Sequence, residues 1–329
     1  MSRRLVQQLK ALGRVRALVV GDIVADTYVH GLTERVSREA PVPVIRFEKE
    51  ECVLGGAANA AANAASLGGR VTMLGLVGKD PMGEEVMRQF AAQGIAFAGF
   101  KEASVATSTK TRVLAGGFHL RKQQVLRIDR EIEAPLPSAL RKRLAQSVLR
   151  LGKKADVVLV SDYGAGVIDS EVIASLRALE EAGVPVAIDS RFGLRALHGF
   201  TLVKPNEPEL ELLTGISLKW DEGLRRAGTM ALEALRTRHL LVTRGRRGMA
   251  LFSKDRAMAW LAPHGVREAV DPTGAGDTVH AAVSLGLGAK LDFADAAALA
   301  NIAGALAVLK PGTATVSARE VAEELGARP

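Results

Sequence analysis

The chain has 329 residues, of which 48% are hydrophobic and 24% charged, and its formal net charge is +8. Such a composition is globular and allows one large α/β domain or two smaller ones. No apolar run is long enough for a membrane span, and the run at residues 17–20 is too short for a signal peptide. The single cysteine, Cys52, cannot form an internal disulfide, so a reducing cytoplasm is the simplest setting.

The positive charge fits anionic partners, but the basic residues are dispersed and only 4% of the chain is aromatic. A nucleic-acid-binding surface would combine clustered basic residues with aromatic ones, or show a zinc pattern, and the sequence has neither. Anionic small molecules therefore explain the charge better than nucleic acid. A general basic bias of the proteome would explain it equally well.

The first half of the chain mixes helices with two segments of exposed strand. Alternating apolar positions around prolines indicate edge strands over residues 27–50. Residues 108–131 again indicate strands, around a Gly-Gly turn with His119 at its tip. We expect residues 27–50 and 100–130 to form one small β lid. The other expected elements are a short helix before a strand at 17–21, an Ala-rich helix at 55–69, a strand at 70–78 and helices at 80–94 and 141–151.

From residue 155 onward, short apolar strands alternate regularly with helices. This alternation indicates a parallel sheet covered on both faces. The strands are expected at 155–162, 184–190, 200–206 and 239–245, with a hairpin at 248–263, and three helices finish the chain. Ligands of such sheets bind at the carboxyl ends of the strands, so the polar residues that end them should ring one cleft. These residues are Asp22, Asp162, Asp189, Asn206 and Thr243.

The stretch "DPTGAGD", residues 271–277, precedes an apolar run that predicts a helix ending at the glycines 286 and 288. Its small residues let a ligand approach the backbone, and the unpaired N–H groups of a helix start favour an anion. Asp277 would repel a phosphate but could accept the proton of a hydroxyl that attacks phosphorus. A glycine-rich turn with an aspartate helix cap is an equally good explanation of this stretch alone.

The common nucleotide signatures are missing from the sequence. It has no Walker loop, no protein-kinase glycine loop, and no Gly-x-Gly-x-x-Gly after the first strand, which disfavours a nicotinamide enzyme. Four other motifs together resemble the ribokinase-like (PfkB) carbohydrate kinases, over about residues 16–322. They are "GGAANAAANAASLG" (55–68), "NEPE" (206–209), "LVTRGRRGM" (241–249) and "DPTGAGDTV" (271–279).

Within that family the chain is similar to the heptose 7-phosphate kinases, through "VVGDIVADTYVHGLTERVSREAPVPVIRFE", "TKTRVL", "QQVLRID" and "LVSDYGAGV". Those enzymes make heptose 1,7-bisphosphate for nucleotide-activated heptose and lipopolysaccharide, and many carry a nucleotidyltransferase domain after the kinase. This chain, ending at Pro329, is expected to be a stand-alone kinase. It departs from the subgroup at Asp189-Ser190-Arg191, where Asp-Pro-Lys is common, and at Arg38, where proline is common.

The resemblance implies a ribokinase-like three-layer sandwich with a central mostly parallel sheet, formed as a single kinase domain over residues 1–329, plus the β lid. It implies ATP and Mg²⁺ as cofactors and leaves open a monovalent cation beside the anion loop. Asp277 would be the catalytic base, and Gly274, Ala275 and Gly276 would hold the developing charge. Glu209 would hold Mg²⁺ through water. ATP would be contacted by Asn206, Glu209, Thr243, Arg244, Gly245, Gly248 and Asn301.

Most of these roles have a structural alternative. Asn206 could cap the next helix with Glu209 in its first turn, and residues 243–248 could form an ordinary turn. Sugar hydroxyls would meet Asp22, Asp26, Gly55, Gly56, Asn59 and Asp189, although both early aspartates could instead cap turns. A substrate phosphate would meet the basic residues Arg35, Lys110, Arg112 and Arg127, each of which could equally belong to a solvated strand face.

Several apolar residues of the lid would lie on one exposed face, and such a face is a docking surface. They are Val42, Val44, Ile45, Phe47, Val113 and Leu126. We expect a homodimer through the lids, and no nucleic-acid or membrane partner. The expected activity is ATP-dependent phosphorylation of a sugar phosphate, heptose 7-phosphate at O1. The alternatives are a fructokinase- or ribokinase-like enzyme of the same family, or a sugar- or nucleotide-binding regulator without turnover.

Overall fold

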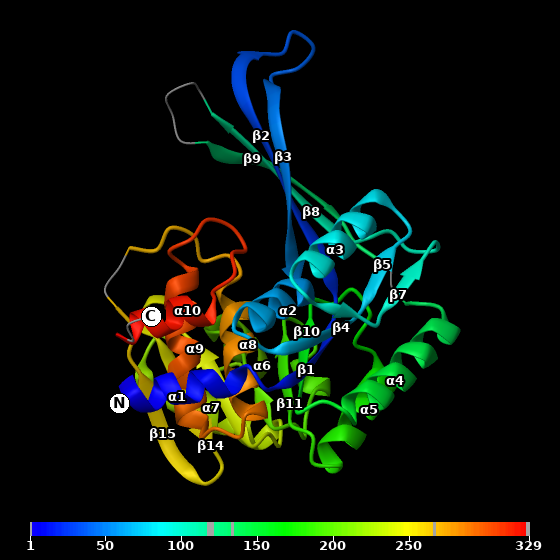
Figure 1. Cartoon of the computed structure of the whole chain (residues 1–329). Coiled ribbons are helices and arrows are strands. Elements are labelled where there is room, and N and C mark those ends of the chain that lie inside the picture. Colours follow the sequence, from blue (N-terminus) through cyan, green and yellow to red (C-terminus); the bar gives the residue numbers. More distant parts are fainter. Residues whose placement is uncertain (1, 117–121, 133–134, 266–267, 327–329) are drawn as a thin grey trace.

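The computed structural model describes residues 2–116, 122–132, 135–265 and 268–326. The body is built on a nine-stranded sheet. Figure 1 shows this body and a second sheet that extends from it. The order in the large sheet is β15-β14-β13-β12-β11-β10-β1-β4-β6, and only the pairs involving β14 are antiparallel. The predicted central, mostly parallel sheet is confirmed. Its strands are β1 (Arg16–Gly21), β4 (Arg70–Leu74), β6 (Ala96–Phe97), β10 (Val157–Asp162), β11 (Val186–Ser190), β12 (Leu202–Val203), β13 (His239–Thr243), β14 (Met249–Ser253) and β15 (Arg256–Leu261).

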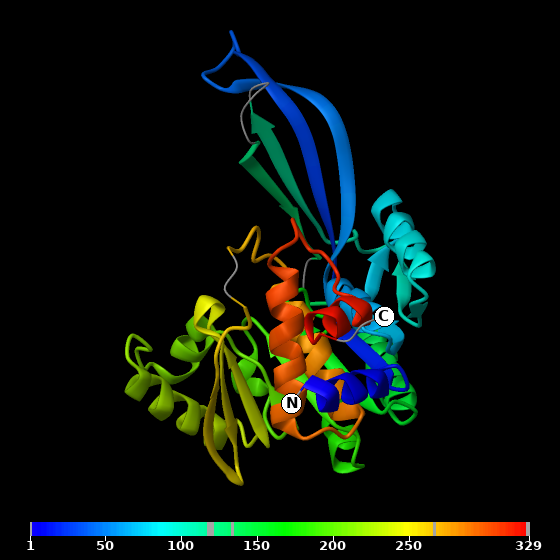
Figure 2. The ribbon, with the colours of Figure 1, turned by 60° about the vertical axis from the view of Figure 1, so that its left-hand side comes forward.

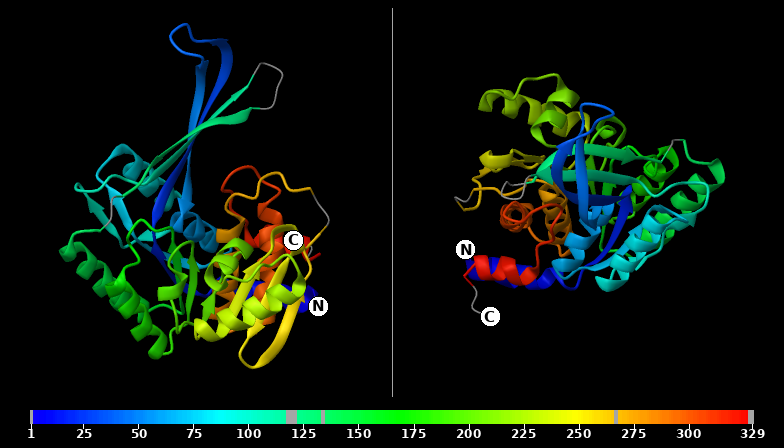
Figure 3. Two further views of the ribbon diagram at one scale, coloured as in Figure 1. Left: turned by 180° about the vertical axis from the view of Figure 1, so that it is seen from behind. Right: turned by 90° about the horizontal axis from the view of Figure 1, so that it is seen from above.

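Helices cover both faces of this sheet, which makes the predicted three-layer sandwich. One face packs against α1 (Ser2–Leu12), α2 (Ala57–Ser66), α3 (Pro81–Ala92), α8 (Ala275–Gly288), α9 (Phe293–Ala307) and α10 (Ala318–Glu324). The other packs against α4 (Ser138–Gly152), α5 (Ser170–Glu181), α6 (Glu207–Thr214) and α7 (Asp221–Ala234). Near the two ends of the chain, α1 and α10 lie side by side (Figure 3). None of the described helices combines the length and apolar character needed to cross a bilayer.

The strand order places a crevice at the centre of the large sheet. From β1 the chain proceeds outward through β4 and β6, whereas from β10 it proceeds the other way through β11 to β13. Such a reversal between neighbouring strands leaves an opening at their carboxyl ends, where ligands of α/β proteins bind. Asp22 directly follows β1 and Tyr163 directly follows β10, so both lie at this opening.

The second sheet, called the small sheet below, has the order β3-β2-β8-β9 and extends well beyond the body (Figure 2). Its strands are β2 (Ile23–Val36), β3 (Pro43–Gly56), β8 (Thr109–Gly116) and β9 (Gln123–Arg130). The pairs β2–β3 and β8–β9 are antiparallel, and β2–β8 is parallel. His119, expected at its tip, lies outside the described residues.

The strand predicted over residues 70–78 is interrupted in the structure. β4 ends at Leu74 in the large sheet, and β5 (Leu76–Gly78) pairs instead with β7 (Phe100–Glu102). The break falls at Gly75, where an added Cβ would lie 2.7 Å from the carbonyl oxygen of Gly21. The apolar pattern is continuous across this position, so it could not reveal that the chain changes sheets there.

Candidate active site

Asp277 lies in the first turn of α8, which begins at Ala275, slightly earlier than the sequence pattern predicts. Gly274 precedes the helix with φ of 80°, in the left-handed region that favours glycine. An added Cβ there would lie 2.7 Å from Nδ2 of Asn59, so a side chain would also clash. The N–H groups of residues 274–276 lie at this helix start, where an anion is favoured, and that of Ala275 also donates to the carbonyl of Pro272 at 3.3 Å.

The carboxylate of Asp277 is 5% exposed and held from two sides. Oδ2 accepts a hydrogen bond from Nδ2 of Asn59 at 2.8 Å, and Oδ1 accepts one from the Tyr163 hydroxyl at 2.8 Å. Burial, and then the charge of Asp189, raise the pKa of Asp277 to about 6, although the two hydrogen bonds lower it in part. A carboxylate with this pKa is ionised at neutral pH and more basic than an ordinary aspartate, as suits a general base.

A buried network fixes the orientation of Asn59. Asn63, one turn further along α2, donates from Nδ2 to Oδ1 of Asn59 at 3.0 Å. Thr278 in turn donates its hydroxyl to Oδ1 of Asn63 at 2.9 Å. Because Oδ1 of Asn59 accepts the hydrogen bond from Asn63, the Nδ2 group of Asn59 is directed at Asp277. The predicted residues Asn59 and Asp277, 218 positions apart, are thus brought into direct contact.

A buried ion pair lies beside the same helix start. Nζ of Lys204 is 2.9 Å from Oδ2 of Asp189, and the two side chains are 4% and 16% exposed. Burial alone would lower the pKa of Lys204, but the charge of Asp189 and its hydrogen bond outweigh burial and raise it. An added Cβ on Gly276 would lie 3.8 Å from Nζ, which places the ammonium next to the small-residue loop. Sequence reasoning missed Lys204.

Asn206 and Glu209 form a capping box at the start of α6. Oδ1 of Asn206 accepts from the N–H of Glu209 at 2.8 Å, and Oε2 of Glu209 accepts from the N–H of Asn206 at 2.9 Å. The structural alternative considered for this motif is therefore confirmed. Burial, and then the charge of Asp189, raise the pKa of Glu209, whereas its hydrogen bond with the Asn206 N–H and the charges of Lys204 and Arg191 lower it, so the capping carboxylate lies among these charged groups.

The residues present fit a weakly held Mg²⁺. The described part of the chain has no group of three or more His, Cys, Asp or Glu side chains arranged to bind a metal. Mg²⁺ at phosphate-transfer sites usually needs only one or two carboxylates, since substrate phosphates and water complete its shell. Glu209 is one such carboxylate, with the charge of Asp189 near it.

The turn after β13 contains four residues predicted to contact the nucleotide. Thr243 ends the strand, and Gly245 and Gly248 have φ of 54° and 77°. Gly248 is also confined, since an added Cβ would lie 2.1 Å from the carbonyl oxygen of Leu261. Asn301, on α9, donates from Nδ2 to the carbonyl of Ala262 at 2.7 Å and so holds the segment after β15 beside this turn.

Arg244, the fourth of these, is committed to structural contacts. It is 8% exposed, its Nε lies 2.9 Å from Oε1 of Glu207, and it also pairs with Asp221 at 3.3 Å. The ring of Trp260 covers the guanidinium, with its centroid 4.7 Å from Cζ. These contacts tie α6 and α7 to the end of β13.

The two early aspartates, predicted to contact sugar hydroxyls, are buried and form contacts within the protein. Asp22 is 1% exposed, and its carboxylate accepts from the N–H groups of Tyr163, Ala165 and Val167 at 2.8–3.2 Å. Burial, and then the charge of Asp162, raise its pKa to about 6. Asp22 thus holds the loop after β10, in line with its alternative as a turn cap.

Asp26 is 5% exposed and forms an ion pair with Arg112 across the β2–β8 pair. Gly55 approaches it closely, because an added Cβ would lie 2.2 Å from Oδ2 of Asp26. Gly56, with φ of 55°, passes close to the carbonyl of Asp22, 2.6 Å from an added Cβ. The two glycines therefore let β3 turn into α2 directly against these aspartates.

The four basic residues predicted to meet a phosphate do not all come together. Lys110 lies at the base of the small sheet, where Arg191 and Arg127 act on its charge. Arg127 is exposed and pairs with Asp129 at 2.6 Å. Arg35 pairs with Val44 near the far end of β2, nine residues beyond Asp26 and hence roughly 30 Å along the strand.

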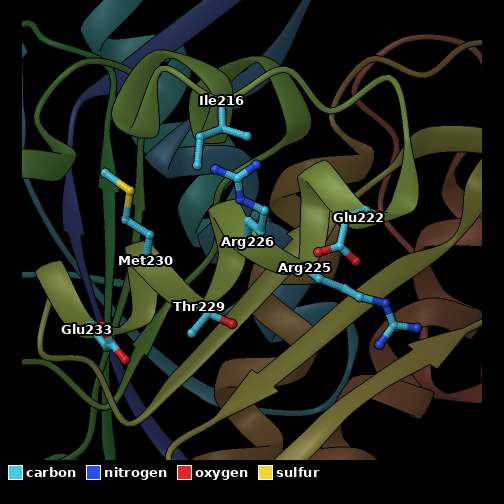
Figure 4. Close-up of a pocket in the computed structure, with 7 residues that line it drawn as sticks. All are labelled: Ile216, Glu222, Arg225, Arg226, Thr229, Met230 and Glu233. Atoms are coloured by element: carbon cyan, nitrogen blue, oxygen red, sulfur yellow. The ribbon is translucent and has the colours of Figure 1, made fainter.

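A shallow hollow lies elsewhere, over the outer surface of α7 (Figure 4). It is lined by Ile216, Glu222, Arg225, Arg226, Thr229, Met230 and Glu233. None of the site residues predicted from the sequence is among these described lining residues. The hollow is therefore separate from the group around Asp277.

Comparison with known proteins identifies the family of the chain. The model of the pfkB family carbohydrate kinases matches residues 16–320, so the chain belongs to that family and is a phosphotransferase acting on an alcohol group. The protein named "Bifunctional protein HldE" from Geobacter metallireducens is 38% identical over 330 residues, and that from Geobacter sulfurreducens is 40% identical over 333. Each alignment covers 99% of this chain but only 66% of the relative.

Solved structures confirm the ribokinase-like fold. Arabidopsis thaliana ribokinase, complexed with ribose and ATP, superposes with a TM-score of 0.75 at 22% identity, covering 94% of this chain and 98% of that one. Escherichia coli phosphofructokinase-2, in complex with potassium, gives 0.78 at 20% identity, covering 95% and 98%. At these identities the likeness concerns the fold alone.

Proposed function

We propose that this kinase transfers the terminal phosphoryl group of Mg·ATP to O1 of heptose 7-phosphate, making heptose 1,7-bisphosphate for ADP-heptose and lipopolysaccharide synthesis. The observation that carries the proposal is the buried carboxylate of Asp277, oriented by Asn59 at the start of α8. The choice of sugar rests on the subgroup likeness of the sequence and on relatives named HldE that match nearly the whole chain.

The residues around Asp277 would divide the work of the transfer. The acceptor hydroxyl gives its proton to Asp277, while the N–H groups of residues 274–276 and the ammonium of Lys204 stabilise charge on the migrating phosphoryl group. Thr243, Gly245, Gly248 and Asn301 border the nucleotide. Glu209 would hold Mg²⁺ through water, and the ion would neutralise phosphate charge.

The sugar phosphate would bind under the small sheet, where Lys110 presents its charge to the cleft. Burial, and then the charges of Arg191 and Arg127, lower the pKa of Lys110, and Asp129 and Glu131 offset the repulsion from the two guanidinium groups only in part. An anion relieves this repulsion. The small sheet would also exclude water from the bound sugar, which limits loss of ATP to hydrolysis.

A substrate panel tests the proposal. We expect ADP release with heptose 7-phosphate at a kcat/KM roughly 100-fold above that with fructose or ribose, because those sugars lack the phosphate that the basic residues would bind. Fructose 6-phosphate separates recognition of phosphate from recognition of the sugar. The same assay with and without K⁺ tests for a monovalent cation.

Two other results would replace the proposal. Highest activity with an unphosphorylated sugar would identify a fructokinase- or ribokinase-like enzyme. Ligand binding without release of ADP in the presence of any sugar would favour a regulator.

The cytoplasm, where ATP is made, is the setting that we propose for the reaction.

We also propose that the protein is a homodimer joined through the small sheets. Phe47, Val42 and Leu126, three residues of the predicted apolar face, are 51–62% exposed, and Val44, Ile45 and Val113 are half-buried. All eight residues of β9, which is an edge strand, are exposed. A sheet with an exposed edge strand and exposed apolar side chains favours association with a second copy of the chain.

The double substitution Phe47→Glu with Leu126→Glu is expected to convert a dimer into a monomer, because charge would be placed in the apolar contact. Sedimentation velocity at micromolar concentration measures this change. Leu212→Glu on α6, at a residue that is 71% exposed, is the matched control and should leave the dimer intact. A wild-type protein that sediments as a monomer would remove the proposal.

A further inference from the structure

Tyr163 contacts the group that we propose to be the catalytic base. It follows β10, and its hydroxyl donates to Oδ1 of Asp277 at 2.8 Å. Burial, and then the charge of Asp277, raise the pKa of Tyr163 well above its ordinary value, so the phenol keeps its proton and remains a donor. The phenolic hydroxyl of Tyr163 thus occupies the carboxylate of Asp277, which an acceptor hydroxyl must also reach.

Two cations hold the Tyr163 ring. Cζ of Arg191 lies 4.7 Å from the ring centroid and Nζ of Lys110 lies 5.7 Å from it, both within the range of cation–π contacts. Arg191 follows β11 in the body, whereas Lys110 belongs to β8 of the small sheet. The contacts therefore connect Asp277, through Tyr163, to both sides of the proposed sugar site.

The same two cations are the ones that an anionic substrate would engage. Arg191 is exposed and Lys110 is half-buried, and neither forms an ion pair within the described residues. A phosphate binds guanidinium and ammonium groups much more strongly than an aromatic ring does. An arriving sugar phosphate would therefore take both cations from the ring and release Tyr163.

We propose that Tyr163 is a positioning residue that occupies Asp277 in the absence of sugar and is released when an anionic sugar binds Lys110 and Arg191. This inference rests on Asp277 being the base of the proposed function. Its consequence is specificity against water, because the base is covered while only nucleotide is bound. A neutral sugar would not draw the cations away and would compete poorly with the Tyr163 hydroxyl.

The test is ATP hydrolysis without sugar. Tyr163→Phe is expected to raise the sugar-free rate of ADP release roughly tenfold, the effect of losing one hydrogen bond to a charged group. The rise should vanish in the double variant Tyr163→Phe with Asp277→Asn. Tyr28→Phe is the matched control: Tyr28 is the only other tyrosine of the chain and also lies against a guanidinium, Arg112 at 5.3 Å, and its variant should not raise hydrolysis.

Arg191→Met gives an independent result. It should raise sugar-free hydrolysis about twofold to threefold, by weakening the hold on the ring, and raise KM for the sugar phosphate about tenfold with a smaller change in kcat. The proposal is overturned if Tyr163→Phe keeps the wild-type melting temperature but shows unchanged or lower sugar-free hydrolysis. Because this assay needs no sugar, failure of heptose 7-phosphate as a substrate would count against the proposed function alone.

Discussion

Asp277→Asn is expected to lower kcat by about a thousandfold, within the range for loss of a general base. The substitution keeps the shape of the side chain but removes its ability to take a proton from the acceptor hydroxyl. Binding of Mg·ATP, measured by calorimetry, should change little, because the carboxylate faces the acceptor. Asp255→Asn, in the exposed turn between β14 and β15, is the control and should keep full activity. A variant that retains more than a tenth of wild-type kcat would show that another group is the base.

The same substitution is expected to stabilise the fold at high pH. A carboxyl group whose pKa is raised on folding, here from 3.8 to about 6, favours the folded state fully only below pH 3.8, and that contribution is lost as the pH rises through 6. Removing the buried charge should therefore raise the free energy of unfolding by up to about 3 kcal/mol at pH 8. Urea unfolding should show a smaller gain at pH 5 than at pH 8. Equal gains would mean that the pKa of Asp277 is not raised.

The kcat/KM of the wild-type enzyme should also fall below about pH 6, because the base becomes protonated there.

Lys204→Met is expected to have the second large effect. It leaves Asp189 buried without its partner, and loss of one member of a buried ion pair costs about 3–5 kcal/mol of unfolding free energy. It also removes a positive charge from the loop at residues 274–276, so kcat should fall roughly a hundredfold. Urea unfolding and ADP release measure the two effects.

A double variant separates these effects. Lys204→Met with Asp189→Asn removes both charges and should recover most of the lost stability while kcat stays low. If the double variant instead regains activity, Lys204 serves only to neutralise Asp189 and has no part in phosphoryl transfer.

The sequence predicted the central sheet well because its strands are continuous apolar runs between helices. Val157–Asp162 is buried throughout, as expected of a parallel strand covered on both faces. The break at Gly75 escaped prediction, since the close approach of the Gly21 carbonyl to this position is visible only in the fold.

For the site, the sequence identified the residues whose types are unusual in their position, such as Asp277 after three small residues. It missed Lys204 and Tyr163, which stand at the ends of strands where a lysine or a tyrosine draws no notice. A signal for Lys204 was present, because a lysine that directly follows the apolar run "FTLV" is expected to be buried and therefore to need an anionic partner. The partner, Asp189, is the end of the neighbouring strand, and only the fold reveals that neighbour.

The position of β1 has a consequence for how the protein is made. On the ribosome this strand emerges long before its neighbour β10, because Arg16 at its start meets Asp156, beside β10, across 140 residues. Its other neighbour, β4, is made much sooner, whereas the helices α8, α9 and α10, which cover part of one face, are made later than β10. Until α8 to α10 have been made, one face of the sheet therefore stays partly uncovered in the nascent chain, and a polypeptide stalled before α8 should depend on chaperones to avoid aggregation.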